Sequence, residues 1–223
     1  MEMEEENMQI TIREPGSAIT HFVGMLMAVL AAMPLLAKAG LSGSLITVTA
    51  MMIFMGSMVM LYGASTLYHA VAVSGRILRV FQKLDHMMIF VLIAGSYTPV
   101  CLIVLGGELG YRLLAAVWGI AAAGILVKAF WISCPKWFSS VIYIAMGWVC
   151  LFVFGELLRT LSAEAFLWLL AGGLIYTVGG VIYALKLPPV HLGKFCFGNH
   201  EVFHLFVMAG SICHFVFMYR FVA

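Results

Sequence analysis

Two histidines four residues apart near the carboxyl end of the chain have the spacing of metal ligands. They stand in the segment His200-Glu-Val-Phe-His204. On an α-helix such residues share one face and lie about 6 Å apart along the axis, so both imidazoles reach one tetrahedral ion. A zinc site needs a third ligand from another helix at the same depth. His69, which ends an apolar stretch, is the candidate for that ligand.

Two further polar residues stand close to His69 in the sequence. Ser65 lies one helical turn before His69 on the same face, and Asp85 is expected to open the next apolar span. Three histidines plus a water leave the open position of catalytic rather than structural zinc. In such a site Asp85 would orient the water or act as its general base, and Ser65 would hold the water or stabilise a developing oxyanion.

The same segment also matches the H-E-x-x-H pattern of metalloproteases, in which Glu201 would be the general base. The extended metzincin pattern requires Gly at 207 and His at 210, whereas this chain has Val207 and Gly210. An intramembrane protease would also need a distant Asp-Gly ligand motif, and Leu84-Asp85-His86 lacks the glycine. The protease remains an alternative that the residues disfavour.

The composition places these residues in a membrane protein. Of 223 residues, 64% are hydrophobic and 10% are charged, with a mean hydropathy of +1.07; a soluble domain is roughly half apolar and about a quarter charged. Soluble enzymes, nucleic-acid binders and secreted disulfide modules are therefore disfavoured. The five cysteines are widely separated and form no CxxC pair, so we interpret them as small buried apolar side chains.

Seven apolar segments are long enough to cross a bilayer as helices. An all-α seven-helix bundle over residues 18–223 is predicted, preceded by a short cytoplasmic segment, 1–17. Arg112 and Lys128 flank the fourth span and are expected to extend to the two membrane surfaces. A kink is expected at Pro99, and close helix approach at Gly172-Gly173 and Gly179-Gly180. The predicted spans are 18–37, 45–69, 86–106, 112–130, 138–155, 165–185 and 199–220.

The distribution of basic residues predicts the orientation in the membrane. Eight Lys and Arg lie on the side of the amino terminus and four on the other side, so the amino terminus is expected in the cytoplasm and the carboxyl terminus outside. This polarity is the reverse of that of G-protein-coupled receptors. The acidic start, Met1 to Glu6, lacks the basic flank of a cleavable signal, so the first span is expected to be retained. Six of the seven histidines, and Asp85, then fall on the cytoplasmic side. We interpret His86, His191 and the deeper His214 as structural.

Together these motifs resemble the hemolysin III family, the bacterial branch of the superfamily that includes the progestin and adiponectin receptors and, more distantly, the alkaline ceramidases. The resemblance runs from Glu14 to the carboxyl end. Its motifs are Glu14…Thr20-His21-Phe-Val-Gly24, Tyr62-x-x-Ser65-x-Leu67-Tyr68-His69, Leu84-Asp85-His86…Ala94-Gly-Ser-Tyr-Thr-Pro99 and His200-Glu-x-Phe-His204…His214.

The resemblance implies a seven-helix bundle with a cytoplasmic amino terminus. It also implies zinc ligands at His69, His200 and His204, with the family's serine at Ser65 and its aspartate at Asp85. Adiponectin-receptor relatives commonly carry Gln at the place of Glu201, which disfavours that residue as an essential base. The family often has Asn where this chain has Ser17, so a polar network involving Glu14 is expected to differ.

These observations favour a multi-pass cell-membrane enzyme, a zinc-dependent hydrolase of lipid amide or ester bonds with a role in membrane lipid homeostasis. Membrane lipids are the expected partners, with an acyl chain entering the bundle from the side. Two alternatives stay open: a non-enzymatic sensor or receptor-like protein with structural zinc, and the pore-forming cytolysin that the family name implies. The sequence specifies neither the lipid nor the oligomeric state.

Overall fold

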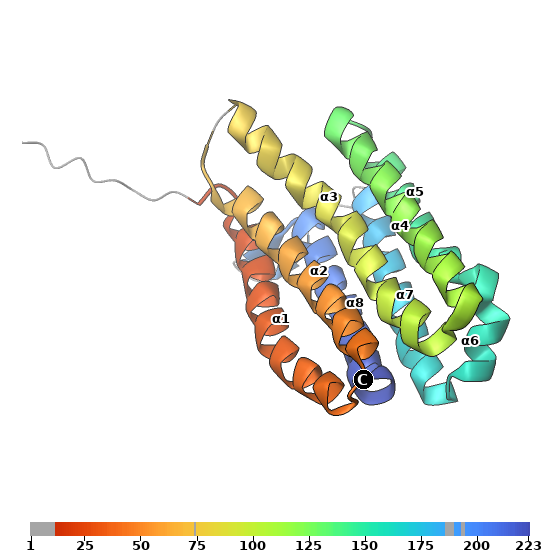
Figure 1. The fold of residues 1–223 in the computed structure, drawn as a ribbon. Helices are drawn as coiled ribbons and strands as arrows, with labels where there is room; N and C mark the ends of the chain where they lie inside the picture. Colours follow the sequence, from red (N-terminus) through yellow and green to blue (C-terminus); the bar gives the residue numbers. More distant parts are fainter. Residues whose placement is uncertain (1–11, 74, 186–189, 193–194) are drawn as a thin grey trace, which may run out of the picture.

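The seven apolar segments are helices in the computed structural model, which describes residues 12–73, 75–185, 190–192 and 195–223 (Figure 1). The prediction of an all-α, seven-span membrane bundle is confirmed. The expected segment 1–17 lies mostly outside the described residues. Two of the basic residues counted on the amino-terminal side, Lys186 and Lys194, also lie outside them. The elements are α1 (Pro15–Leu41), α2 (Leu45–Ala70), α3 (Gly75–Pro99) with the π-helical η1 (Val100–Leu105), α4 (Gly107–Phe130), α5 (Lys136–Gly147) with the 3₁₀-helical η2 (Trp148–Val153) and α6 (Phe154–Thr160), α7 (Ala163–Leu185), and α8 (Asn199–Phe217) with the π-helical η3 (Met218–Val222).

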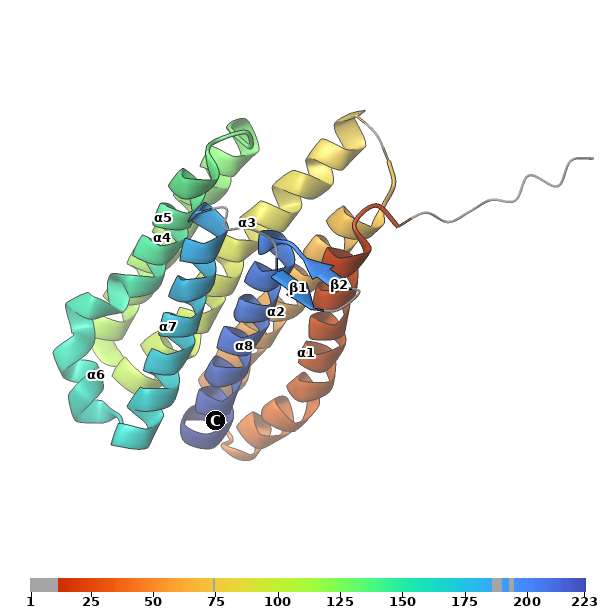
Figure 2. The ribbon, with the colours of Figure 1, turned by 180° about the vertical axis from the view of Figure 1, so that it is seen from behind.

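A short antiparallel pair of strands lies before α8, where no strand was predicted (Figure 2). It consists of β1 (Val190–Leu192) and β2 (Phe195–Phe197), with His191 opposite Cys196. His191 is therefore a strand residue. Both strands are built mainly from Val, Leu and Phe, and Val and Phe favour a pleated backbone.

The third span begins earlier than predicted. Residues 75–85 carry several charged side chains, so a hydropathy criterion placed the start at 86, but α3 already begins at Gly75. Asp85 consequently lies about three turns inside the helix instead of opening it. Its side chain is buried within the bundle. Pro99 is the point where the α-helix gives way to the π-helical residues Val100–Leu105, which places an irregularity at the expected kink.

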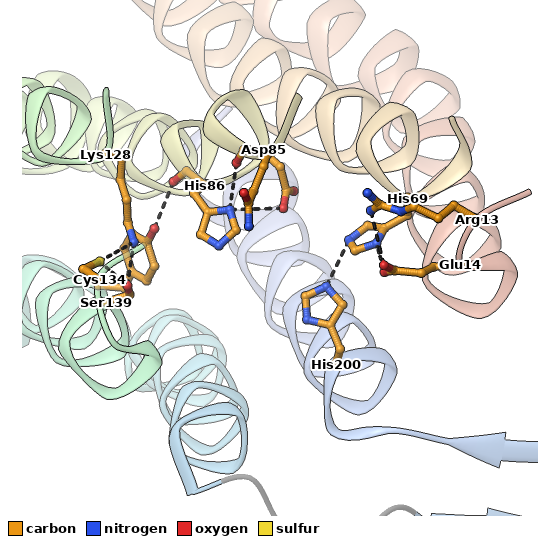
Figure 3. Close-up of polar contacts among 11 residues, drawn as sticks. Arg13, Glu14, His69, Asp85, His86, Lys128, Cys134, Ser139 and His200 are labelled. Atoms are coloured by element: carbon orange, nitrogen blue, oxygen red, sulfur yellow. Dashed lines mark hydrogen bonds and ion pairs between the residues drawn. The ribbon is translucent and has the colours of Figure 1, made fainter. Parts of the chain in front are cut away.

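Lys128 is buried, contrary to the expectation that it extends to the membrane surface. Only 2% of the residue is exposed. Its Nζ donates hydrogen bonds to Ser139 Oγ at 2.5 Å and to Cys134 Sγ at 3.1 Å (Figure 3). The start of α5 covers the last turn of α4, so the side chain turns inward to these polar atoms. Arg112, at the opposite end of α4, is exposed and pairs with Glu108.

Close helix contacts shape the interior around α8. This helix packs against both α7 and α1, and α2 packs between α1 and α3 (Figures 1 and 2). Gly172 of α7 lies directly against the ring of His214 of α8, where a side chain at 172 would collide. Gly179 and Gly180 also meet neighbouring side chains, whereas Gly173 faces open space. The glycines of α7 thus allow the close approach that was predicted, with Gly173 as the exception.

Candidate metal centre

Three histidines from two helices meet at one end of the bundle. His69 is the penultimate residue of α2, and His200 and His204 occupy the first two turns of α8. One ring nitrogen from each lies within 4.8 Å of the others. The Nε2 atoms of His69 and His200 are 3.0 Å apart, and these two side chains point toward one another (Figure 3). The three residues predicted from spacing are thus brought together.

The donor set of this histidine cluster fits a zinc ion. Imidazole nitrogen is a common zinc ligand, and three histidines with one open position form the arrangement of catalytic zinc sites. His69 and His204 are each only 1% exposed, so the site is shielded from bulk water. Imidazole also suits copper, iron and nickel. The geometry therefore identifies a site able to hold a transition-metal ion, and zinc is the identity that we propose below.

Helix starts and ends position the cluster. Gly198 precedes α8 in an extended conformation, and the helix then presents His200 and His204 on one face. The chain entering α1 runs beside the end of α2, where the Glu14 amide donates to the His69 carbonyl at 3.0 Å. Pro15, whose fixed φ suits a first helical residue, then starts α1. The first turns of α1 consequently lie against both ligand-bearing helices.

Asp85 and Ser65 are buried near the histidine cluster but are not members of the three-histidine group. The Asp85 carboxylate is buried on α3, 3.6 Å from His86 Nδ1, and lines the same cavity as His200 and His204. Ser65 is fully buried one turn before His69. Its hydroxyl has no hydrogen-bond partner within the part of the chain that the structure describes. The neighbouring Asp85 carboxylate, a bound water or a substrate oxygen would each satisfy this buried hydroxyl.

An apolar cavity of about 180 Å³ connects the cluster with the bundle interior. Asp85, His200 and His204 line one end, and Leu157 and Phe166 line the other. Between them the wall is mainly aliphatic and aromatic, with Ser96, Thr177 and His214 among its polar members. An apolar cavity with a few polar groups at one end is suited to a ligand with a hydrocarbon chain and a polar head.

Sequence reasoning placed Glu14, Thr20 and His21 in a family motif but assigned no site role to these polar residues, which contact the cluster from the start of α1. The His21 ring stacks on His204 with 3.5 Å between ring centroids and a 7° interplanar angle. Glu14 contacts His69, Thr20 contacts His204, and Ser17 contacts Glu201. The detectable signal was the spacing of Glu14, Ser17 and His21, which places three polar side chains on one face of an otherwise apolar span.

Comparisons with known proteins identify the family of this chain. The family model described as "Haemolysin-III related" matches residues 9–215. Hemolysin-3 of Bacillus cereus is 36% identical over 203 residues, which cover 91% of this chain and 89% of the relative. The Hemolysin-3 homolog of Bacillus subtilis is 36% identical over 206 residues, or 92% of each chain. The ADIPOR-like receptor IZH2 of Saccharomyces cerevisiae is 31% identical over 137 residues, 60% of this chain and 39% of the relative. The seven spans, the polar motifs and these matches together establish that the chain belongs to the haemolysin-III-related family of multi-pass membrane proteins.

Proposed function

We propose that this protein is a zinc-dependent hydrolase that cleaves an amide or ester bond of a membrane lipid. The observation that carries the proposal is the shared cavity: the buried carboxylate of Asp85 and two histidines of the cluster, His200 and His204, line one apolar space. His69, His200 and His204 would hold the ion. When bound, zinc supplies Lewis acidity, which polarises a carbonyl and brings the pKa of a neighbouring water toward about 7.

The residues around the cluster have roles that follow from their chemistry. Asp85 would accept a proton from the attacking water and return it to the departing amine or alcohol, which completes the addition of water across the bond. Ser65, whose hydroxyl lacks a partner among the described residues, would donate a hydrogen bond to the water or to the developing oxyanion. The apolar wall would exclude bulk water and hold the acyl chain.

The test combines metal analysis with an assay for fatty-acid release. Detergent-purified protein loaded with zinc is incubated with a ceramide, an N-acyl amide and a phospholipid, and released fatty acid is quantified by mass spectrometry. We expect Asp85→Asn to retain zinc and to lose roughly 10²- to 10⁴-fold in turnover, as for a general base. His204→Ala should lose both zinc and activity.

Glu156→Gln is the matched control, because Glu156 is a carboxylate at the opposite end of the bundle and pairs with Arg159. This variant should behave as wild type. Failure of zinc-loaded wild type to release fatty acid from all three lipids would refute the hydrolase. Equal turnover by wild type and Asp85→Asn would refute the role of Asp85.

The names of distant relatives favour a second candidate, a non-enzymatic lipid sensor with a structural metal. Two relatives are named as receptors or receptor-like: IZH2 and the Progestin and adipoQ receptor-like protein 1 of Caenorhabditis elegans, which is 26% identical over 179 residues. In a sensor, the cavity would bind an acyl chain without cleaving it, and the metal would link α2 to α8. Tight binding of intact lipid by zinc-loaded protein, with no turnover, would favour this function.

The name Hemolysin-3 of the Bacillus cereus relative suggests a pore-forming cytolysin. The apolar wall of the cavity argues against a conducting pathway, because ion channels line their pores with carbonyls or charged side chains. Ion conductance across a planar bilayer by purified protein at a low protein-to-lipid ratio would support the cytolysin.

A further inference from the structure

The beginning of α1 contacts two candidate metal ligands, His69 and His204, at the ring nitrogen Nδ1. Glu14 Oε2 lies 2.6 Å from Nδ1 of His69, and Thr20 Oγ1 lies 3.1 Å from Nδ1 of His204. In both rings the contact occupies Nδ1, which leaves Nε2 for the cluster. One helix thus reaches ligands that belong to two other helices, α2 and α8.

The hydrogen bonds of Thr20 determine the tautomer of His204. A threonine hydroxyl has one proton to donate, and Thr20 Oγ1 donates it to the Ser17 carbonyl at 2.9 Å. Toward His204 the hydroxyl can therefore only accept, so Nδ1 carries the ring proton. A neutral imidazole has one N–H. The lone pair of His204 Nε2 is consequently free to bind a metal ion.

Glu14 imposes the same tautomer on His69. An ionised carboxylate only accepts hydrogen bonds, so Nδ1 of His69 must donate. Two contacts hold Glu14 in place: its amide bonds the His69 carbonyl at 3.0 Å, and the Arg13 guanidinium lies 3.3 Å from its other oxygen. Arg13 is itself stacked over the Tyr68 ring at 4.2 Å. Figure 3 shows Arg13 and Glu14 on the side of His69 that faces away from His200.

A third contact ties α1 to the helix that carries the other two histidines. Ser17 Oγ donates to Glu201 Oε1 at 2.8 Å. Glu201 is the residue between the two ligands that the protease alternative would use as a base. Its side chain is bonded to α1, which accounts for this carboxylate without a catalytic role.

We propose that Glu14 and Thr20 are positioning residues of the metal centre, which fix the tautomers and ring orientations of His69 and His204 so that both offer Nε2. The inference rests on the metal site of the proposed function. Ligating histidines are commonly held through their second nitrogen by a carboxylate or another acceptor, and loss of that partner typically costs about 10- to 100-fold in metal affinity or activity. The role is independent of whether the metal is catalytic or structural.

The test measures metal binding without any assay of activity. Zinc affinity of the full-length protein in detergent is determined by competition with a chromophoric chelator, and the visible spectrum of the Co²⁺-loaded protein reports coordination. We expect Glu14→Ala and Thr20→Val each to lose about 10- to 100-fold in zinc affinity and to alter the cobalt spectrum. Glu14→Gln should lose less than Glu14→Ala, because an amide oxygen still accepts from Nδ1 but carries no charge.

Two control variants separate this role from packing. Thr66→Val removes a hydroxyl that also bonds its own helix, at the Tyr62 carbonyl, one turn from His69, and Glu156→Gln removes a distant carboxylate. Both should bind zinc as wild type does. Unchanged zinc affinity and cobalt spectra in Glu14→Ala and Thr20→Val, with wild type binding zinc, would overturn this inference alone. Wild type that binds no zinc would overturn the metal centre itself. If Glu14→Ala does not fold, Glu14→Gln and Thr20→Val decide the question.

Discussion

His21 is the residue whose environment most needs an explanation. Its ring is 2% exposed, stacks on the His204 ring and has no hydrogen-bond partner for either nitrogen among the described residues. It stands outside the group of three histidines that share one site. The stack, rather than a hydrogen bond, is therefore its contribution to the site: a flat ring that limits the rotation of His204.

Substitution of His21 tests this interpretation. His21→Phe keeps an aromatic ring and removes unsatisfied polar atoms, so it should retain zinc and unfold at the wild-type temperature or above. His21→Ala leaves a void beside His204 and should destabilise the protein by about 1–3 kcal/mol. Metal analysis and thermal unfolding followed by tryptophan fluorescence check both variants. Loss of zinc from His21→Phe would instead identify His21 as a ligand.

At the scale of single residues, helical periodicity accounts for what could be predicted. His200 and His204 are neighbours on one helix face whatever the remaining fold, and Ser65 and His69 likewise. The hydrogen-bond partners of these residues could not be predicted in this way. Thr20 and His204 are 184 positions apart, and Glu14 and His69 are 55 apart. Such contacts depend on which helices are neighbours, and helical periodicity within one segment does not specify that.

At the scale of elements, hydropathy predicted each span and placed its ends within about five residues of the observed helix, except at the start of α3. It did not predict how the helices pack. Hydropathy misplaces the start of α3, because charged residues continue that helix beyond the apolar segment. It also does not reveal that the charged side chain of Lys128 turns inward. The glycines of α7 gave more information about helix packing than hydropathy did. Gly172 is in contact with His214, whereas its neighbour Gly173 has nothing within 4 Å of the place of a side chain.

The two adjacent glycines of α7 predict opposite effects of one substitution. Gly172→Ala should lower the unfolding temperature, because the added methyl group collides with His214 and forces α7 away from α8. Gly173→Ala should stabilise by about 0.5–1 kcal/mol, since alanine is the better helix former and the site is open. Thermal unfolding of both variants provides the measurement. Equal effects of the two substitutions would show that α7 and α8 do not pack as described.

At the scale of the whole molecule, the histidine cluster joins parts of the chain that are far apart. His69 and His200 are 131 positions apart, and their helices have mostly different neighbours: α2 packs against α1 and α3, and α8 packs against α7 and α1. The number of spans was predictable from composition. Their order around the bundle was not, because each span is apolar on most of its surface and hydropathy does not specify which helix lies next to it.

Removal of the metal is expected to destabilise the contact between α2 and α8. A ligand that binds only the folded state and is present at about 100 times its Kd stabilises that state by about 2.7 kcal/mol. Chelation of zinc should therefore lower the unfolding temperature of detergent-purified wild type, and added zinc should restore it. His69→Ala should unfold near the temperature of metal-free wild type and respond to neither treatment.

His214→Ala separates a general loss of packing from loss of the metal. His214 is also a histidine of α8, but it packs against Gly172 and lies outside the three-histidine group. Its alanine variant should be less stable than wild type yet still respond to chelator and to zinc. A wild type whose measured zinc content falls on chelation while its unfolding temperature stays constant would contradict a connecting role. Such a result would require the unfolded chain to bind zinc as tightly as the folded protein does, because an ion that binds only the folded state must raise the unfolding temperature.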